Sequence, residues 1–301
     1  MLDLNHRQGL WLLATIAITG CSEGIGPGGR GRLAFLRYNG TTGSDYQIYT
    51  VAFSTGDTAA LTHLAANRWI PSWSPDGSKI AFNSDQDSTG QEIFVMNADG
   101  SLLHRLTNFL GQALCPSWSA DGKKILFDFE GGRNPALYVM NADGSDTTRL
   151  AQGTHPFYQC PVWSPDGSRI AFVSADSADV LYTDIYLLNA DGTGEINWSH
   201  NPGRFDTQPA WSPDGTKIAF FSERNGLAGL FVMNVDGTGL KPLVTAPGNN
   251  TCPAWSPDGQ WIAFTSTRDG QTELYAMALD GSSTRRLTDD SEEDICPRWQ
   301  P

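Results

Sequence analysis

The stretch Ile70-Pro71-Ser72-Trp73-Ser74-Pro75-Asp76-Gly77, followed closely by Ile80-Ala81-Phe82, recurs along the chain. The phrase Trp-Ser-Pro-Asp-Gly begins again at Trp163, Trp211 and Trp255, and the copy at Trp118 has alanine in place of its proline. Only Trp299-Gln300-Pro301 remains of it at the C-terminus. Successive tryptophans lie 44 to 48 residues apart. Self-similarity at such a period is typical of repeat architectures, so this repeat decides the fold.

Each copy predicts four short strands and two tight turns. Apolar residues around the Pro-x-Trp segment predict the first strand, and Ile80-Ala81-Phe82 and Ile93-Phe94-Val95-Met96 predict the next two in the first copy. Pro-Asp-Gly forms the first turn, because proline presets φ at about −65° and glycine accepts positive φ. Asn97-Ala98-Asp99-Gly100 forms the second, since Asp-Gly between apolar runs is a strong hairpin signal. We assign structural roles to the six repeat tryptophans and to Asp76, Gly77, Asp166, Gly167, Asp214, Gly215, Asp258 and Gly259.

Four antiparallel strands per period of about 40 to 45 residues predict an all-β fold, a β-propeller. Leu33-Ala34-Phe35, Ile48-Tyr49-Thr50-Val51 and Leu61-Thr62 supply strands two to four of a blade that lacks its first strand. Cys296-Pro297-Arg298-Trp299 supplies a first strand with nothing after it. We therefore predict a six-bladed propeller over residues 33–301, closed by pairing of the N- and C-terminal strands, with an open array as the alternative.

The repeat phrases, including Leu137-Tyr138-Val139-Met140-Asn141-Ala142-Asp143-Gly144, resemble those of the TolB-type propeller family. The resemblance extends over nearly all of Leu33 to Trp299. It implies a six-bladed propeller, which in TolB serves as a periplasmic platform for protein partners of the cell envelope. TolB carries a separate α/β domain before its propeller, and we expect none here because few residues separate Cys21 from Leu33.

Residues 1–20 are predicted to be a lipoprotein signal peptide. His6 and Arg7 precede the apolar run Leu10 to Ile18, which is too short to span a bilayer comfortably. Ile18-Thr19-Gly20-Cys21 resembles the bacterial lipobox, which implies acylation of Cys21; an ordinary secretory signal is the alternative. Residues 21–32 are glycine-rich and predict a flexible tether. We expect a lipid-anchored protein of the bacterial cell envelope, on the periplasmic side of a membrane or at the cell surface.

Composition narrows the class of partner. The 301 residues are 40% hydrophobic and carry a formal charge of −13, which fits one globular domain and argues against nucleic acid, because nucleic-acid binding needs a basic footprint. Six of the ten tryptophans are repeat tryptophans and so predict packing between blades. We expect a monomer that touches the membrane only through its lipid anchor.

The loops divide into two kinds. Both stereotyped turns emerge on one side of an up-and-down blade, which we call the turn face, and the variable connections emerge on the other, the loop face. Function usually resides on variable loops held by a rigid scaffold. The residues five positions before each repeat tryptophan, which we call the rim positions, should enter the central funnel there: Arg68, Ala113, Tyr158, Asp206, Asn250 and Asp294.

Arg68, Tyr158, Asp206, Asn250 and Asp294, with Trp69, are therefore the predicted contacts for an envelope protein or peptide. A water-filled axial channel without a ligand is the alternative. We predict no catalytic residue, metal or cofactor, because the histidines show no local metal-ligand spacing. The competing hypothesis is a metal-dependent lyase or hydrolase of a polar polymer such as an acidic polysaccharide, built on His155 and His200 of adjacent blades.

Four cysteines occupy one repeat position, directly before proline: Cys115, Cys160, Cys252 and Cys296. Disulfides between adjacent blades are one possibility, Cys115 with Cys160 and Cys252 with Cys296. Equivalent points on a six-fold ring, however, are separated by their distance from the axis, which we expect to exceed the Cα separation of about 4.4 to 6.8 Å in a disulfide. We therefore predict buried free thiols.

Overall fold

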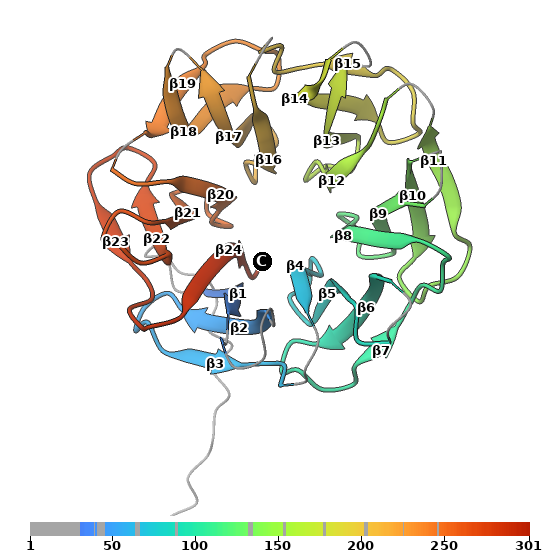
Figure 1. Ribbon diagram of the computed structural model, residues 1–301, viewed down its shortest axis with the longest axis horizontal. Helices are drawn as coiled ribbons and strands as arrows, with labels where there is room; N and C mark the ends of the chain where they lie inside the picture. Colours follow the sequence, from blue (N-terminus) through green and yellow to red (C-terminus); the bar gives the residue numbers. More distant parts are fainter. Residues whose placement is uncertain are drawn as a thin grey trace, which may run out of the picture.

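A computed structural model describes residues 31–301 except 39, 41–45, 64–66, 88–89, 132–134, 153–154, 177–178, 202–203, 225 and 246. The described residues form six four-stranded antiparallel sheets arranged as a ring, and they contain no helix (Figure 1). None of them therefore belongs to a helix of the length and apolarity that crossing a membrane requires. The predicted signal peptide, its lipidation site Cys21 and nearly all of the predicted tether lie outside the described residues.

The strands follow the repeat, with the innermost strand first in each blade. Blade 1 comprises β24 (Glu293–Trp299), β1 (Arg32–Tyr38), β2 (Tyr46–Ala52) and β3 (Thr58–Ala60). Blade 2 comprises β4 (Arg68–Trp73), β5 (Lys79–Ser84), β6 (Glu92–Asn97) and β7 (His104–Arg105). Blade 3 comprises β8 (Gln112–Trp118), β9 (Lys124–Glu130), β10 (Ala136–Asn141) and β11 (Thr148–Gln152).

The remaining blades have the same order. Blade 4 comprises β12 (Gln159–Trp163), β13 (Arg169–Asp176), β14 (Asp179–Asn189) and β15 (Ile196–Asn197). Blade 5 comprises β16 (Asp206–Trp211), β17 (Lys217–Arg224), β18 (Leu227–Asn234) and β19 (Lys241–Val244). Blade 6 comprises β20 (Asn250–Trp255), β21 (Trp261–Ser266), β22 (Glu273–Ala278) and β23 (Thr284–Arg286). The six-bladed all-β prediction is confirmed.

The ring closes through the two ends of the chain. β24 pairs antiparallel with β1, with Leu33 opposite Trp299 and Arg37 opposite Asp294. The backbone N–H of Gln300 donates to the carbonyl of Arg32 at 2.8 Å, which extends the ladder by one more bond. Blade 1 therefore holds the first and last parts of the fold in one sheet, as the sequence predicts.

The hydrophobic core lies between the blades and not inside any one of them. The phenylalanine of each Ile-Ala-Phe-like phrase is fully buried, for example Phe82 and Phe264. Six apolar clusters each combine side chains of two adjacent blades; one packs Ala34 and Ile48 of blade 1 against Trp73 and Phe82 of blade 2. A single four-stranded sheet cannot bury both of its faces, so each blade depends on its two neighbours.

The first turn is held by its own side chains. Ser74 Oγ donates to Asp76 Oδ1 at 2.5 Å and accepts from the backbone N–H of Lys79 at 2.9 Å. Gly77 has φ 66°, a conformation that favours glycine. The bonds to Asp76, first of all that from Ser74, lower the pKa of its carboxyl group to about 2. Equivalent contacts form in the turns of Asp166, Asp214 and Asp258.

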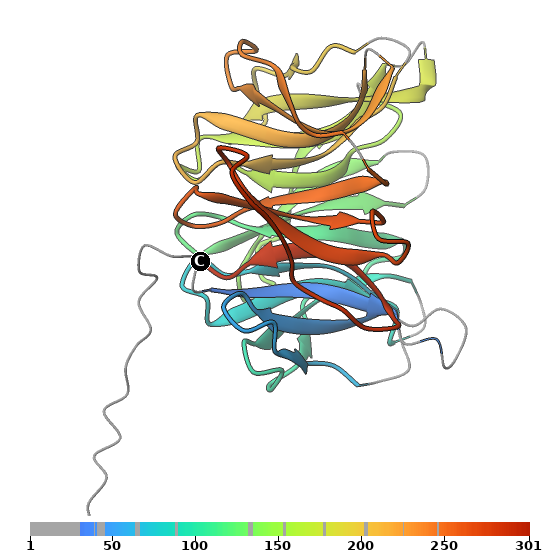
Figure 2. The same ribbon diagram turned by 90° about the vertical axis from the view of Figure 1, so that its left-hand side faces the viewer.

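The two faces of the ring carry different connections, as predicted. The flat ring is seen from its side in Figure 2, where the strands run from one face to the other. The C-terminus lies at the turn face, because the Gln300 side chain donates to the carbonyl of Gly77 at 2.9 Å. The links between blades and the connections between second and third strands lie at the loop face.

Deleting residues 293–301 removes β24 and leaves the edge of β1 unpaired. We expect the truncated protein to lose several kcal/mol of its free energy of unfolding, a large part of the roughly 5 to 15 kcal/mol typical of a domain. Thermal unfolding followed by circular dichroism measures the loss, and removal of Pro301 alone is the control. An unchanged melting temperature in the larger truncation would contradict a ring held together by this strand pair.

Candidate functional site

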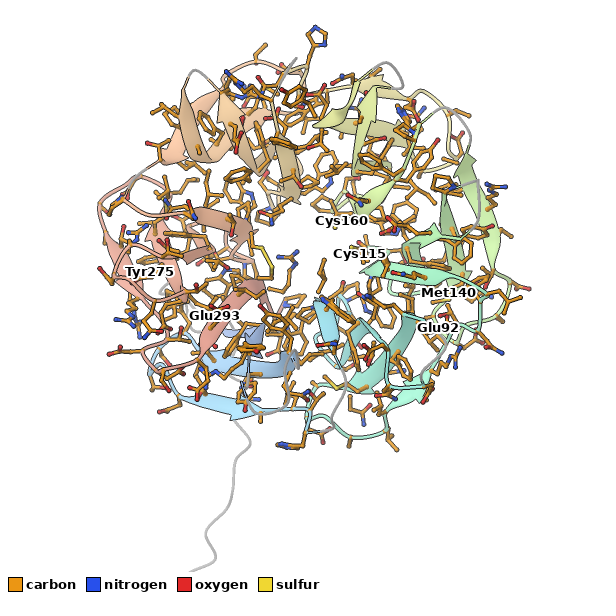
Figure 3. The ribbon with its side chains drawn as sticks, in the orientation of Figure 1. Glu92, Cys115, Met140, Cys160, Tyr275 and Glu293 are labelled. Atoms are coloured by element: carbon orange, nitrogen blue, oxygen red, sulfur yellow. A yellow bond between two sulfur atoms is a disulfide. The ribbon has the colours of Figure 1, made fainter. Side chains whose placement is uncertain are left out.

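The axial channel narrows where each inner strand carries a left-handed residue before its proline. These residues, three positions before each repeat tryptophan, have φ between 44° and 58°: Ile70, Cys115, Cys160, Gln208, Cys252 and Cys296. Positive φ is uncommon for residues other than glycine and is costly for a β-branched residue such as Ile70. All six line a cavity of about 170 Å³ together with Arg298. Figure 3 shows Cys115 and Cys160 at the inner edge of the ring.

The prediction that all four ring cysteines are free thiols is wrong. Cys252 and Cys296 form a disulfide with a Cα separation of 5.0 Å. Cys115 and Cys160 are free, but their Sγ atoms lie only 2.8 Å apart. The left-handed backbone pushes this position toward the axis, so the ring of Cα atoms is narrower than the sequence argument assumes. At 5.0 Å the separation falls inside the range that a disulfide spans.

Five of the six rim positions are buried, and the expectation that these five are exposed at the funnel is wrong. Tyr158 is 1% exposed, and Asp206, Asn250 and Asp294 are 0% exposed. Strand geometry explains the error, because successive side chains point to opposite sides. Residues one position later are exposed or partly exposed: Trp69, Leu114, Gln159, Thr207, Thr251 and Ile295. Arg68 begins β4, and its side chain lies outside the described part of the molecule.

Three rim residues are held by an arginine of their own blade. Asp206 pairs with Arg224, and Ser222 Oγ donates to Asp206 Oδ1 at 2.5 Å. In blade 6, Ser266 Oγ donates to Asn250 Oδ1 at 2.7 Å, and Arg268 Nη2 donates to the same oxygen at 3.2 Å. Burial raises the pKa of the Asp206 carboxyl group, although Ser222 and Arg224 oppose the shift.

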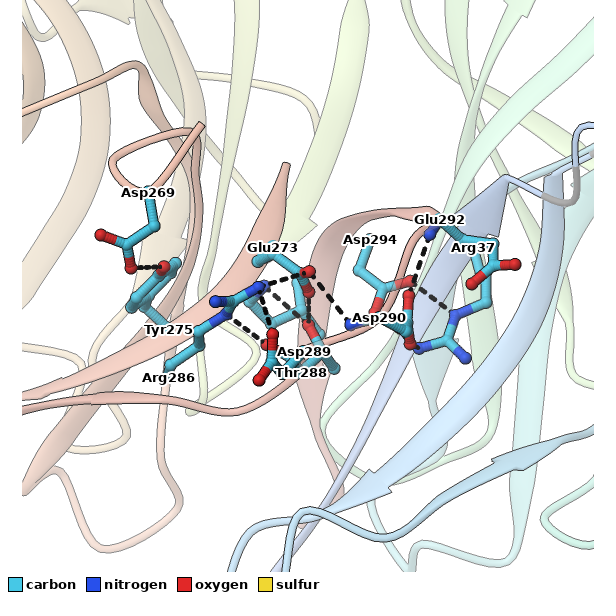
Figure 4. A network of polar contacts seen from close by, with 11 residues as sticks. Arg37, Asp269, Glu273, Tyr275, Arg286, Thr288, Asp289, Asp290, Glu292 and Asp294 are labelled. Atoms are coloured by element: carbon cyan, nitrogen blue, oxygen red, sulfur yellow. Dashed lines mark hydrogen bonds and ion pairs between the residues drawn. The ribbon is translucent and has the colours of Figure 1, made fainter. Parts of the chain in front are cut away.

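The third pair anchors the closing blade. Arg37 donates to both carboxylate oxygens of Asp294 at 2.7 Å, a bidentate arrangement (Figure 4). Arg37 also pairs with Asp290, and its guanidinium lies over the ring of Tyr49 at 4.7 Å. Burial raises the pKa of Asp294 to about 6, although Arg37 favours its charged form. The ion pair thus crosses the joint between β1 and β24.

A carboxylate cluster lies beside this joint. Single oxygens of Glu273, Asp290 and Asp294 lie within 4.8 Å of one another, the only such cluster of possible metal ligands among the described residues. Glu273 accepts from Arg286 at 2.8 Å, and Asp290 and Asp294 contact Arg37 (Figure 4). Because each of these carboxylates already contacts an arginine, the cluster is arranged as an ion-pair network that holds the loop between β23 and β24.

The loop face also presents apolar side chains. Leu110 is fully exposed, Leu227 is 45% exposed and Phe205 is 38% exposed. Phe205 contacts the ring of Tyr182, with centroids 5.5 Å apart. These residues belong to links between blades or to the ends of strands at the loop face. Apolar side chains exposed singly are common on soluble proteins, whereas a contiguous exposed patch marks a site of interaction.

The two histidines of the competing lyase hypothesis are not brought together as a metal site. His155 Nε2 lies 2.7 Å from Glu195 Oε1, and its Nδ1 lies 3.1 Å from the carbonyl of Ala175. His200 is exposed. Within the described residues, no cluster of possible metal ligands contains a histidine.

Sequence reasoning missed two grooves at the turn face. Cavities of about 600 and 420 Å³ lie between the first turns of neighbouring blades, one beside Asp166 and Trp211 and the other beside Asp76 and Trp118. It also missed the arginines that hold the rim. The signal for these was present in two blades, where serine and arginine follow the buried phenylalanine at the same spacing: Phe220, Ser222 and Arg224, and Phe264, Ser266 and Arg268.

Comparisons with known proteins agree with the repeat analysis. Residues 25–180 and 159–301 match the family described as the TolB beta propeller domain. The Tol-Pal system protein TolB of Francisella tularensis subsp. mediasiatica (strain FSC147) is 31% identical over 127 residues, which are 42% of this chain and 29% of that protein. The matched part thus spans less than a third of this relative's length.

Two further proteins are similar to parts of the chain. The crystal structure of TolB from Acinetobacter baumannii is similar with a TM-score of 0.79 at 23% identity, covering 90% of this chain and 67% of that chain. The uncharacterized peptidase YuxL of Bacillus subtilis (strain 168) is 35% identical over 61 residues, which are 20% of this chain and 9% of that protein. Likeness at this level concerns the propeller, not the activity.

Replacing Asp206 by alanine leaves the Arg224 guanidinium buried without its carboxylate. We expect a loss of about 3 to 5 kcal/mol in the free energy of unfolding, the usual effect of breaking a buried pair from one side. The double variant Asp206→Ala/Arg224→Met should recover most of this loss, because no uncompensated charge remains. Urea unfolding of both variants provides the measurement. A single variant within about 0.5 kcal/mol of the unsubstituted protein would contradict the buried pair.

Proposed function

The chain belongs to the TolB beta propeller domain family, and from this premise we propose that it is a lipid-anchored, non-catalytic protein-binding module of the bacterial cell envelope. The observation that carries the proposal is the set of inner-strand ends that buried pairs hold at the loop face. Buried pairs fix the rim positions of three blades, and the residue that follows each of them in sequence is partly exposed. A surface whose scaffold is already ordered loses little conformational entropy on binding.

The proposed docking surface consists of Trp69, Phe205 and Leu227, with Gln159 and Thr207, which occupy the same repeat position as Trp69. Trp69 and Phe205 offer large apolar area with few rotatable bonds, as binding hot spots usually do. Tyr182 supports Phe205 from β14. The occupant we propose is a protein or peptide of the cell envelope, by analogy with the relative named as part of the Tol-Pal system.

The proposed location, at a membrane of the cell envelope, rests on the N-terminal sequence. Acylation of Cys21 would tether the propeller by residues 22–30, close to a membrane surface and without an inserted helix. The described chain starts at the turn face, because the carbonyl of Gly31 accepts from the backbone N–H of Phe53 and Arg32 begins β1. This would leave the loop face directed away from the tether and accessible to a partner.

The variant Cys21→Ser lacks the thiol that acylation requires. We expect it to lose incorporation of a radiolabelled fatty acid and to move from the membrane fraction to the soluble fraction of expressing cells. The variant Ser22→Ala is the control and should stay with the membrane. Retention of both label and membrane association by Cys21→Ser would contradict the proposed anchor.

Replacing Trp69 or Phe205 by alanine should weaken capture of the partner. We expect a loss of about 2 kcal/mol or more if either is a hot spot, which is about a 30-fold weaker affinity. The full-length tagged protein is cross-linked in native envelopes, the captured proteins are quantified by mass spectrometry, and the affinity of the recovered partner is then measured with purified proteins. Melting temperatures should not change.

Lys123→Ala and Arg169→Ala at the turn face are the matched controls, and they should retain the partner. Loss of capture in these variants, with normal capture by the loop-face variants, would assign docking to the turn face. Normal affinity in all four variants would contradict the proposed surface.

A further inference from the structure

The four ring cysteines form two pairs beside the axial channel, each between neighbouring blades. Cys252 and Cys296 come from blades 6 and 1, and Cys115 and Cys160 come from blades 3 and 4. Ile70 and Gln208 occupy the two remaining places of the ring. Both pairs join neighbouring blades, share the left-handed backbone before proline and line the same cavity. One pair is oxidised and the other is not.

We propose that Cys115 and Cys160 are an exchangeable dithiol–disulfide pair in the axial channel, whose redox partners are small disulfides and thiols. The geometry is the first support. Their Sγ atoms lie 2.8 Å apart, so a bond between them needs little movement of the backbone (Figure 3). The equivalent pair in the same ring, Cys252 and Cys296, already has a Cα separation of 5.0 Å.

The two sulfur atoms differ in access. Cys160 is partly exposed, whereas Cys115 is buried, with 9% exposure. The hydrogen bond with Cys160, together with burial, raises the pKa of the Cys115 thiol well above its usual value. Cys160 is therefore the sulfur that meets the redox partner, and Cys115 reacts second. The cavity that both cysteines line has a volume of about 170 Å³, so a folded protein does not enter it.

Asp128 is placed to accept the proton of Cys115. This carboxyl group is 0% exposed; Oδ1 accepts from the backbone N–H of Cys160 at 3.2 Å, whereas Oδ2 has no hydrogen-bond partner. A buried oxygen without a partner is rare and calls for an explanation. Burial, and after it the charge of Glu130, raise the pKa of Asp128 to about 7, although the Cys160 N–H and the Cys115 side chain favour the charged form.

The guanidinium group of Arg298 is the positive charge beside the two thiols. The Arg298 side chain lines the same cavity and interacts electrostatically with Cys115 and Cys160. Its Nη1 donates a hydrogen bond to the carbonyl of Pro297, at 3.0 Å. A positive charge beside two thiols stabilises the thiolate, which is the nucleophile in exchange.

The exchange balances as two substitutions at sulfur. The Cys160 thiolate attacks a disulfide R–S–S–R, forming the mixed disulfide Cys160–S–S–R and releasing R–S⁻, which takes up the proton that Cys160 lost. Cys115 then transfers its proton to Asp128 and attacks Sγ of Cys160, which releases the second R–S⁻. That thiolate receives the proton from Asp128. The protein pair loses two electrons and the small disulfide gains them.

The test uses the purified full-length protein in glutathione buffers that range from fully reduced to fully oxidised. Each sample is denatured, alkylated, digested, and analysed by mass spectrometry for the alkylated fraction of every ring cysteine. We expect Cys115 and Cys160 to lose alkylation together and a disulfide-linked peptide containing both to appear. In Cys160→Ser, Cys115 should stay alkylated throughout. In Cys252→Ser/Cys296→Ser, the conversion of Cys115 and Cys160 should persist.

Asp128→Asn tests the proton acceptor. We expect oxidation by oxidised glutathione to be about 100-fold slower, the lower end of what a positioned general base contributes. The rate should also lose its inflection near pH 7, the pKa of Asp128, and keep only the rise at higher pH that thiol ionisation itself produces. A purely structural role of Asp128 would leave this pH profile unchanged.

Three outcomes would overturn the proposal. If Cys115 and Cys160 stay fully alkylated in every buffer, they do not form a disulfide and are only packed thiols. A linked peptide that joins Cys160 to Cys296 would show pairing across the axis. An unchanged rate and pH profile in Asp128→Asn would remove the proton acceptor. The linked peptide is sought in the unsubstituted protein, so this result does not depend on any variant folding.

Discussion

The ring depends on one repeated interaction, the repeat tryptophan wedged between neighbouring blades. The indole N–H donates to an inner-strand carbonyl of the preceding blade in four cases: Trp73 to Arg298, Trp118 to Ser72, Trp211 to Val162 and Trp255 to Ala210, at 3.1 to 3.3 Å. Each of these four indoles therefore buries a large apolar surface and satisfies its polar atom at the same time, whereas the buried indole nitrogens of Trp163 and Trp299 have no hydrogen-bond partner in the described part of the chain. Since every apolar cluster is shared by two blades, the fold is stable only when the ring closes.

A second constraint acts three residues earlier, where the left-handed residue before proline produces a β-bulge in the inner strand. The N–H of the bulged residue needs a partner, and a side chain of a neighbouring blade supplies it: Thr265 Oγ1 at 2.9 Å for Cys296, Gln208 Oε1 at 2.7 Å for Cys252 and Asp128 Oδ1 at 3.2 Å for Cys160. The bulge brings six side chains to the axis. One local backbone feature thus sets the width of the channel and the pairing of its cysteines.

Sequence reasoning found what the repeat states directly: the strand order, the turn residues, the six blades and their closure through Trp299. It failed where the result depends on the radius of the ring or on the direction in which a side chain points. In β16, side chains alternate between the two sides of the strand, so that Asp206 is buried and Thr207 is partly exposed. The repeat sequence does not show which of the two alternating positions faces the interior. The ring radius depends on the positive φ of residues such as Cys252, which a strand pattern does not predict. The role of Cys21 and of the exposed loop-face residues stays a prediction.

The inner strands join these features in consecutive residues. In β16, Asp206 is buried and paired, Thr207 is partly exposed, and Gln208 is left-handed at the axis; Asp294, Ile295 and Cys296 repeat this order in β24. Replacing a buried ion pair by apolar residues often leaves stability unchanged, so the contribution of Arg37 and Arg224 is to fix the strand ends, not to add net stability. The buried paired residue, the partly exposed residue and the axial residue follow one another directly in the chain. A partner that contacted the partly exposed residue Ile295 would therefore bind next to the axial residue Cys296.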